Sequence, residues 1–439
     1  MDFAHTAEDE AFRDELRGWL DEHLDPFLAE WSEDDAPSDE GATGESVPPV
    51  ADVAERSGAA SSAGTRSRGG SEGRAAGQQG TMKSMERRRA WQRKLNEGQW
   101  AAINWPKEWG GREATVTQNV IYSEEHARYR TPGIYNANGL WQIGPMIIRW
   151  GDEEQKQRWI PNILNADDHW CQGFTEPEAG SDLANLRTTA VLDGDDYVLN
   201  GQKIWISSAH IAKWGLFLVR TDPGAIERGE KHVGITALIV DMEADGIECR
   251  TIRDIAGEEM FNEIFFTDAR VPAAYRLGDE GAGWQVAMGT LGHERVGTAG
   301  LAITMRSDLD AMVNLARSVN PDALRDPGIR ERIARTHTDI EYTKLLNYRA
   351  LSKILKGEPN WPEVPLAKLQ WSHLAQTLAE LAVDLLGPAG MMSKGGPDAA
   401  DGGAWNRLYM YQRYTSIGAG TTEVQKNILA DKAIRLPKK

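Results

Sequence analysis

The chain has 439 residues, with 49 Lys and Arg against 66 Asp and Glu, and its formal net charge is -17. A chain of this length can bury a large core and is expected to form two or three domains. The acidic balance argues against nucleic acid as the main partner, because phosphate backbones are bound by clusters of Lys and Arg. Two cysteines, Cys171 and Cys249, are too few for a disulfide framework, and the absence of a clustered Cys/His pattern predicts no metal site.

The first residues lack the basic start and the apolar run of a signal peptide. No stretch of the chain reaches the roughly 18 to 20 apolar residues that a membrane helix requires. We therefore expect a soluble, cytoplasmic protein that does not insert into a membrane.

The N-terminal part of the chain is predicted to be helical. In residues 1–31, Phe12, Leu16 and Leu20 recur at helical spacing and predict an amphipathic N-terminal helix. Residues 32–80 are rich in Ser, Gly, Ala and charged residues, so this insertion is expected to be disordered, as a linker or as a regulatory or docking segment. Helical periodicity returns over 81–169, which completes an all-α domain.

The next region, 170–275, changes to the pattern of a β domain. Alternating runs flank Asp193 and Gly194, which is a strong hairpin signal, and further runs of strand length follow. We expect a small antiparallel barrel or sandwich.

The last region, 276–439, is helical again. Its pattern predicts four long helices at about 284–318, 327–356, 364–386 and 404–432, which would form a four-helix bundle. The fold class is therefore a multidomain α+β protein with an α domain, a β domain and an α bundle in that order.

Glycine-rich segments at 278–283 and 418–420 look like nucleotide-binding loops. Neither follows a strand within a βαβ unit, so a Rossmann site is not expected. The stretch 171–188, CQGFTEPEAGSDLANLRT, is more informative, because backbone N–H groups in a Gly/Ser turn can hold a polar ring edge or an anion. Thr175 and Ser181 add hydroxyl groups, although a plain turn explains the same residues.

Three motifs in order carry a family resemblance. FTEPEAGSD at 174–182, NGQKIWISSA at 200–209 and GTTEVQKNIL at 420–429, on an α–β–α layout, resemble the acyl-CoA dehydrogenase family. The resemblance covers nearly the whole chain outside the insertion. It implies a flavoprotein of lipid metabolism that binds FAD non-covalently between the β domain and the bundle. It also implies an acyl-CoA substrate and reoxidation by an electron-transferring flavoprotein.

The resemblance also assigns roles to individual residues. One group would lie against the flavin ring and the substrate: Phe174, Thr175, Gly180 and Ser181. A second group would cover the other side of the ring: Trp205, Ile206 and Ser207, although Trp205 taken alone is more simply a core aromatic. Thr421 and Glu423 match cofactor contacts at the start of a helix, where free N–H groups suit a phosphate.

Two departures from the family pattern affect the adenosine half of FAD. The family often has an Arg-x-x-Phe-Gly motif that reaches the cofactor of a neighbouring subunit, and nothing between 312 and 335 matches it. The Gly-Gly segment of the family is LLGPAG at 385–390 here, with Pro388 in place of the second Gly. Which residues and which subunit hold the adenosine remains open on sequence grounds.

The reaction that the resemblance implies removes a proton from the α carbon of a thioester, while a hydride leaves the β carbon. The base must be a carboxylate whose pKa is raised by desolvation, and the thioester oxygen must be polarised. Many members of the family carry the catalytic Glu directly before the Gly of GTT. That position is Ala419 here, which cannot accept a proton.

The family has a second position for the base, on the first helix of the bundle and beside an Arg. Glu294 and Arg295 occupy it, and an apolar row of Trp284, Met288 and Leu291 suggests that this face points into protein. We therefore predict that Glu294 is the catalytic base and that Arg295 supports the substrate site. A structural ion pair between these two residues is the alternative, and His293 is a weaker candidate base. In the family, a backbone N–H at the position of Ala419 polarises the thioester, and we assign this role to Ala419 and Gly420.

Other functions stay open at this point. A desulfinase-like flavoprotein that processes a thioester without desaturation would also lack the usual Glu. A non-catalytic subunit of a mixed assembly would explain the departures at the adenosine end. We expect a homodimer or homotetramer, with a paralogue as a further option. The acyl group is not defined, and its pocket is expected around 136–145.

Overall fold

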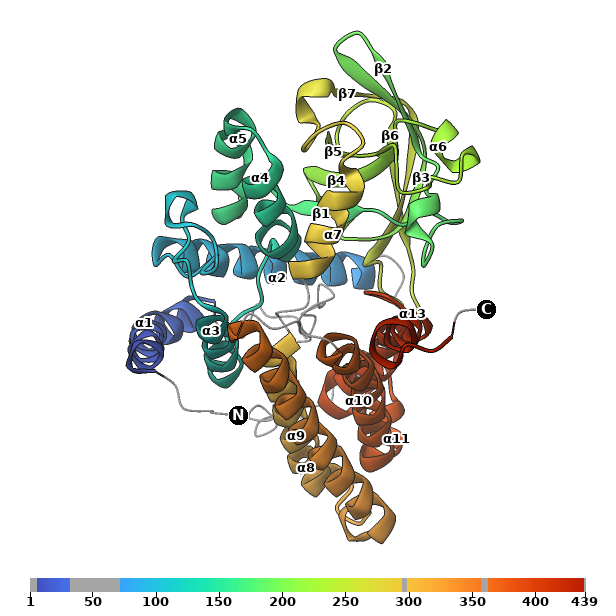
Figure 1. Ribbon diagram of the computed structural model, residues 1–439. Helices are drawn as coiled ribbons and strands as arrows, with labels where there is room; N and C mark the ends of the chain where they lie inside the picture. Colours follow the sequence, from blue (N-terminus) through green and yellow to red (C-terminus); the bar gives the residue numbers. More distant parts are fainter. Residues whose placement is uncertain (1–5, 32–71, 294–297, 357–361, 438–439) are drawn as a thin grey trace.

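The computed structural model describes residues 6–31, 72–293, 298–356 and 362–437. A helical N-terminal domain, a central β domain and a C-terminal set of long helices follow one another in the chain (Figure 1). The α–β–α order predicted from the sequence is confirmed.

The helices of the N-terminal domain begin at side chains that cap them. Thr6 Oγ1 accepts a hydrogen bond from the backbone N of Asp9 at 3.1 Å, and the Asp9 carboxylate accepts one from the backbone N of Thr6 at 3.1 Å. Such reciprocal capping satisfies backbone N–H groups that the helix itself leaves without partners. Thr115 and Asp152 cap two further helices in the same way. The helices are α1 (Ala7–Glu30), α2 (Glu72–Glu97), α3 (Val116–Tyr129), α4 (Gly144–Trp150) and α5 (Glu153–Leu164).

Helix α2 begins at Glu72, inside the segment 32–80 that was expected to be disordered. The structure therefore differs from this expectation over 72–80, and the segment 32–71 lies outside the described residues. Composition alone did not show where helix α2 starts, because Gly, Ala and Gln continue across the boundary.

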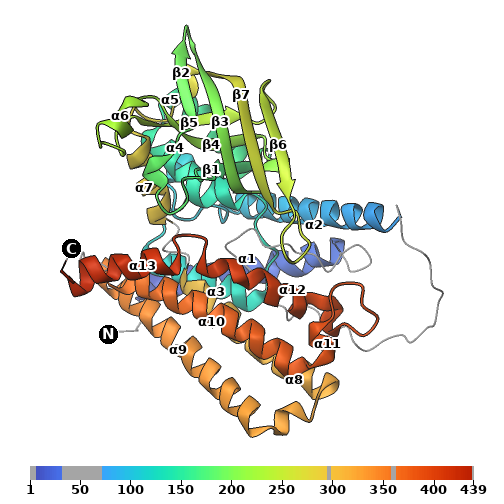
Figure 2. The ribbon, with the colours of Figure 1, turned by 90° about the vertical axis from the view of Figure 1, so that its right-hand side faces the viewer.

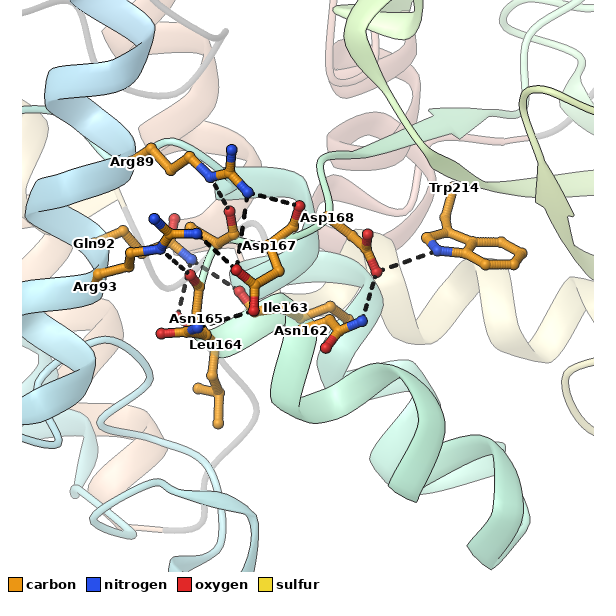
Figure 3. A network of polar contacts seen from close by, with 11 residues as sticks. Arg89, Gln92, Arg93, Asn162, Ile163, Leu164, Asn165, Asp167, Asp168 and Trp214 are labelled. Atoms are coloured by element: carbon orange, nitrogen blue, oxygen red, sulfur yellow. Dashed lines mark hydrogen bonds and ion pairs between the residues drawn. The ribbon is translucent and has the colours of Figure 1, made fainter.

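Polar side chains of α2 fix this helix to the C-terminal end of α5 (Figure 3). Arg89 Nε donates to the carbonyl of Ala166 at 2.7 Å, and the guanidinium of Arg93 lies 2.7 Å from a carboxylate oxygen of Asp167. The amide of Gln92 donates to the carbonyl of Ile163 at 2.8 Å and is fully buried. The Gln92 contact satisfies a carbonyl in the last turn of α5, where C=O groups lack partners within the helix, and the two Arg contacts hold the segment that follows it.

The β domain is a seven-stranded sheet in the order β1-β4-β2-β3-β7-β6, with β5 paired to β4. Asp193 pairs with Asp196 across the turn at Gly194, which confirms the predicted hairpin. Strands β1 and β2 run parallel to β4, so the sheet is mixed rather than wholly antiparallel. The strands are β1 (Trp170–Gly173), β2 (Thr189–Asp193), β3 (Asp196–Ser207), β4 (Trp214–Arg220), β5 (Ile235–Asp241), β6 (Ile247–Ile252) and β7 (Phe261–Pro272).

The C-terminal helices lie below the β domain and carry a core of their own (Figures 1 and 2). The single helix expected at 284–318 is described as two segments, because α7 ends at His293 and α8 begins at Thr298. Val286 and Ala287 of α7 belong to the core shared with the N-terminal domain and β5. The helices are α7 (Gly283–His293), α8 (Thr298–Val319), α9 (Pro327–Leu355), α10 (Glu363–Leu386), α11 (Pro388–Met391), α12 (Ala404–Tyr411) and α13 (Thr422–Ile428).

Within the described residues, no helix combines the length and apolar character needed to cross a membrane. The same part of the chain holds no group of three or more His, Cys, Asp or Glu side chains placed to bind a metal ion.

Candidate active site

Two of the motifs singled out in the sequence lie side by side in the β domain. The backbone N of Ile204, on β3, donates to the carbonyl of Thr175 at 3.0 Å. Phe174 is buried and Thr175 is half-buried. The contact places the Phe174–Thr175 segment next to the end of β3 that carries Trp205, although the two motifs are separated by about thirty residues in the chain.

A buried ion pair holds these two segments together. Lys203 Nζ on β3 donates to Glu176 Oε1 at 2.7 Å and to the carbonyl of Phe174 at 3.1 Å. The Glu176 carboxylate also accepts the backbone N–H groups of Arg187 and Thr188 at 2.6 and 2.9 Å. A buried charge is costly unless it is paired and hydrogen-bonded, and both conditions are met here.

The environment of this pair shifts both pKa values downward. Burial lowers the pKa of Lys203 to about 8, although Glu176 acts in the opposite direction. Burial tends to raise the pKa of Glu176, but Lys203 and the hydrogen bonds to this carboxylate outweigh it, so that the pKa lies below its ordinary value. Glu176 and Lys203 were not among the predicted site residues, and a Lys within a predicted strand was a signal that could have identified them.

The end of β3 presents an aromatic side chain to solvent. Trp205 is 57% exposed and has a φ of 61°, at an irregularity in the pairing of β3 with β7. Its neighbour Ile206 is 1% exposed, and Ser207 is half-buried. The Trp205 ring meets the ring of Phe261 edge-on, with centroids 6.1 Å apart. Trp205 is thus not a core aromatic, and one face of the indole is available to another planar group.

Gly180 and Ser181 lie at the exposed rim of the loop that follows Thr175. The backbones of Glu176 and Ala179 exchange hydrogen bonds of 3.2 and 3.0 Å, which closes this loop. The closed turn therefore ends directly before Gly180 and Ser181.

The remaining predicted residues form a second segment, at the start of α13. Ala419 and Gly420 have φ values of 53° and 82°, and both are exposed. Thr421 caps α13, because its Oγ1 accepts a hydrogen bond from the backbone N of Val424 at 3.1 Å. The local backbone N–H and the Thr421 hydroxyl lower the pKa of the exposed Glu423. No described contact joins this segment to the Thr175 loop directly.

Lys368 of α10 supports the chain just before this second segment. Its ammonium group donates to the carbonyl of Thr415, which also accepts from Ser372 Oγ at 2.8 Å. Burial lowers the pKa of Lys368 to about 8, against an opposing influence of Glu423. Lys368 was not predicted as a site residue.

The predicted base falls outside the part of the chain that the structure describes. Glu294 and Arg295 lie in the gap between α7 and α8. On α7 itself, the buried face is formed by Val286, Ala287 and Thr290, whereas Met288 is 42% exposed. Met288 therefore lies off the buried face, whereas the half-buried Trp284 packs against the core.

The segment expected to contact the acyl group contains an unusual turn. Residues Gly139–Ile143 form a π-helical turn that leads into α4. The buried Asn136 Oδ1 accepts the backbone N–H groups of Trp170 and Gly139 at 3.1 and 3.2 Å, so this segment is fixed to β1. Isolated π-helical turns are frequent at functional sites.

The residues at the end of β1 fit a flavin ring. Gln172 Oε1, two residues before Phe174, is buried and accepts no hydrogen bond from the described residues. A buried acceptor without a partner is uncommon in native proteins. The pyrimidine side of a flavin ring carries an N–H donor that would satisfy it, and the exposed Trp205 indole suits an aromatic ring system. Gln172 is a further residue that the sequence analysis did not single out.

A separate crevice of about 530 Å³ opens between α1, α3, α8 and α9. Charged side chains line it, including Arg13, Arg17, Glu125 and Lys344. None of the predicted site residues that the structure describes lies in this crevice, so it is distinct from the candidate active site.

Comparisons with known proteins agree with this arrangement. Three family profiles match the chain, described as the N-terminal domain of acyl-CoA dehydrogenase at residues 75–167, the middle domain at 171–269 and the C-terminal domain at 281–434. Acyl-CoA dehydrogenase IpdE1 of Mycobacterium tuberculosis is 38% identical over 81% of this chain and 89% of its own length. The protein of the same name from Mycolicibacterium smegmatis is 37% identical over 81% of this chain and 90% of its own length.

Solved structures show the same similarity. A structure described as the Tcur3481-Tcur3483 steroid ACAD has a TM-score of 0.77 and 28% identity, with both chains covered over 100% of their lengths. The ChsE4-ChsE5 complex from Mycobacterium tuberculosis has a TM-score of 0.72 and 28% identity, again over 100% of both chains.

Proposed function

This chain belongs to the acyl-CoA dehydrogenase family of flavin-dependent oxidoreductases, and we propose that it desaturates an acyl-CoA thioester to the trans-2-enoyl-CoA with Glu294 as the base. The observation that supports Glu294 as the base is the identity of the residue before Gly420, which is alanine. Ala419 offers no proton acceptor, so the carboxylate must come from another part of the chain.

FAD, which members of the family bind, would supply the acceptor for the hydride that leaves the β carbon. The chain would hold the flavin ring with Gln172, Phe174, Thr175, Gly180 and Ser181 on one segment and Trp205, Ile206 and Ser207 on another. Thr421 and Glu423 would meet the cofactor near the start of α13. The buried ion pair of Glu176 and Lys203 supports this arrangement, because it fixes the first two segments relative to each other.

The backbone of Ala419 and Gly420 would polarise the thioester oxygen. Both residues have positive φ values, as in tight turns whose backbone N–H groups can bind an anion. Donors placed where negative charge develops lower the barrier to enolate formation. Glu294 would remove the α proton, and Arg295 would help to hold the substrate beside it. An electron-transferring flavoprotein would then reoxidise the cofactor.

The substrate that we propose is a bulky acyl-CoA derived from a steroid. The support is the likeness to a structure described as a steroid ACAD, which matches this chain over its full length. The absence of a carboxylate side chain at Ala419 leaves room for a branched or ring-bearing acyl group. Residues 136–145, including the π-helical turn, would line the acyl pocket.

The decisive experiment is anaerobic bleaching of the visible flavin band by a panel of acyl-CoAs, straight-chain and steroid-derived. Wild type and Glu294→Gln are compared side by side, with flavin content measured in both. Bleaching by wild type alone supports both the reaction and the base, and the most effective acyl-CoA identifies the substrate class. If neither protein bleaches although flavin is bound, desaturation is excluded and a desulfinase-like reaction, with a different product, takes its place.

A mixed assembly with a paralogue is the second candidate. The similar ChsE4-ChsE5 structure is a complex of two proteins, and this chain departs from the family pattern where the adenosine half of FAD is bound. In the extreme case this chain would be a non-catalytic subunit. The purified single chain would then bind no FAD and would gain it only with its paralogue, whereas a homodimer or homotetramer would bind FAD alone.

A further inference from the structure

We propose that the ion pair between Glu258 and Arg407 is a positioning contact that sets the loop 417–421 against the end of β3. This inference rests on the proposed function, because it concerns the distance between the two halves of the candidate active site. Glu258 lies in the β domain, between β6 and β7, and Arg407 lies on α12. Arg407 binds Glu258 with two nitrogens, Nε to Oε1 and Nη2 to Oε2, the latter at 2.9 Å.

The turn that carries Glu258 is rigid before it meets Arg407. Asp254 Oδ1 accepts the backbone N–H groups of Ala256 and Glu258, both at 2.9 Å. The backbone N of Asp254 donates to the carbonyl of Glu258 at 2.9 Å, and Gly257 at φ 85° closes the turn. The backbone that carries Glu258 is fixed by these bonds, so it loses little conformational entropy when the ion pair forms.

The same turn is attached to the residues that are proposed to face the flavin. The backbone N of Ser208 donates to the carbonyl of Met260 at 2.9 Å. The fully buried Asn262 donates through Nδ2 to the carbonyls of Ile206 and Met260 at 2.9 and 3.1 Å. Any displacement of Glu258 is thereby transmitted to the segment from Trp205 to Ser207.

On the other side of the ion pair, Arg407 is connected to Ala419 through a short, continuous path. Helix α12 ends at Tyr411, and a 3₁₀ helix over Gln412–Ser416 follows without a break. The carbonyl of Tyr414 accepts the backbone N–H groups of Ile417 and Gly418 at 2.8 and 2.9 Å. In Figure 2, the stretch from α12 to α13 runs along the side of the bundle that faces the β domain.

We expect this ion pair to be more favourable than the surface ion pairs of the chain, because its side chains are less exposed to solvent. The side chains of Arg407 and Glu258 are 18% and 23% exposed, whereas those of Arg270 and Asp193, on the hairpin, are 56% and 63% exposed. Two-point contacts of Arg with a carboxylate fix orientation as well as distance. Arg407 and Glu258 can therefore hold the two domains at one separation.

The test compares Arg407→Met, Arg407→Lys and Glu258→Gln with the surface control Arg270→Met. Two properties that do not depend on turnover are measured: hydrogen exchange of backbone amides in 412–425 and the dissociation constant of FAD from reconstituted protein. We expect Arg407→Met to raise exchange in 412–425 and to weaken FAD binding about tenfold, with Arg407→Lys between it and wild type. Arg270→Met should match wild type.

A double variant completes the test. The Arg407→Met/Glu258→Gln double variant should lose no more FAD affinity than Arg407→Met alone, because the two side chains act as one contact. Additive losses, or unchanged exchange in 412–425 in Arg407→Met, would overturn the proposal. If Arg407→Met does not fold, Glu258→Gln, which keeps the shape of the side chain, takes its place in the comparison. Failure of wild type to bleach with any acyl-CoA would refute the proposed reaction but would leave these two measurements interpretable.

Discussion

Lys203 Nζ lies 2.7 Å from Glu176 Oε1, and the two side chains are 0% and 6% exposed. This pair joins the loop that begins at Phe174 to the strand that ends at Ser207. The residues that we propose to face the flavin on both segments therefore depend on a contact between two residues that are not themselves proposed to touch the cofactor.

Removing one partner of this ion pair should lower the free energy of unfolding far more than removing both. We expect Lys203→Met to lower the free energy of unfolding by about 3–5 kcal/mol, because it leaves the Glu176 carboxylate buried without its cation. The Lys203→Met/Glu176→Gln double variant should be clearly more stable than the single variant. Urea unfolding followed by circular dichroism measures both, and equal stabilities of the two variants would show that the pair carries no such role.

The identity of the base can be tested by moving the carboxylate. Glu294→Gln should retain flavin and lose turnover by several orders of magnitude. Adding Ala419→Glu to this variant should recover part of the activity, since many family members carry their catalytic Glu at that position. Single-turnover reduction of the flavin is the measurement. Near-normal reduction in Glu294→Gln would exclude Glu294, and Ala419→Gln in the same background is the matched control.

Trp205 should report directly on cofactor binding. Its indole is 57% exposed, and stacking against a flavin ring would quench its fluorescence. We expect Trp205→Phe to remove a defined part of the fluorescence change on adding FAD, and Trp205→Ala to weaken FAD binding as well. Trp405, which is buried on α12, provides a control position at which Trp→Phe should leave the FAD-dependent signal intact.

Acid should destabilise the fold through His169. Burial is the largest cause that lowers the pKa of His169 to about 4, with smaller contributions from His210 and Arg88. The unfolded chain binds this proton below about pH 6.5 and the folded chain only below about pH 4, so the free energy of unfolding falls as the pH drops through this range. The effect approaches about 3 kcal/mol at the lower limit. Unfolding curves at pH 7 and pH 4.5 should differ less for His169→Phe than for wild type, and an identical pH dependence would contradict this role.

The cap of α13 should matter for both stability and the cofactor. Thr421→Ala removes the hydroxyl that accepts from the backbone N of Val424, which costs about 1 kcal/mol for a typical helix cap. Thr421→Ser keeps the hydroxyl and should behave like wild type. If Thr421→Ala and Thr421→Ser bind FAD equally well, the Thr421 hydroxyl stabilises the helix and does not contribute to cofactor binding.

The motif segments could be predicted from the sequence because each is a local property of the chain. The hairpin at Gly194, the capped helices and the order of α and β regions follow from residue spacing over short windows. Met288 was a wrong indicator of the buried face of α7, although Trp284 packs against the core, since a helix with apolar residues on several faces does not show which face is covered. The exposed position of Trp205 could not be predicted either, because it depends on an irregularity in the pairing of β3 with β7.

The family and the lack of a carboxylate at Ala419 follow from the sequence alone, because motifs and side-chain identities are local properties of the chain. Only the tertiary structure decided that Glu176 and Lys203 hold two distant segments together and that Glu258 meets Arg407 across two domains. These contacts join residues far apart in sequence, and no periodicity or local propensity specifies which distant partner a buried charge will find.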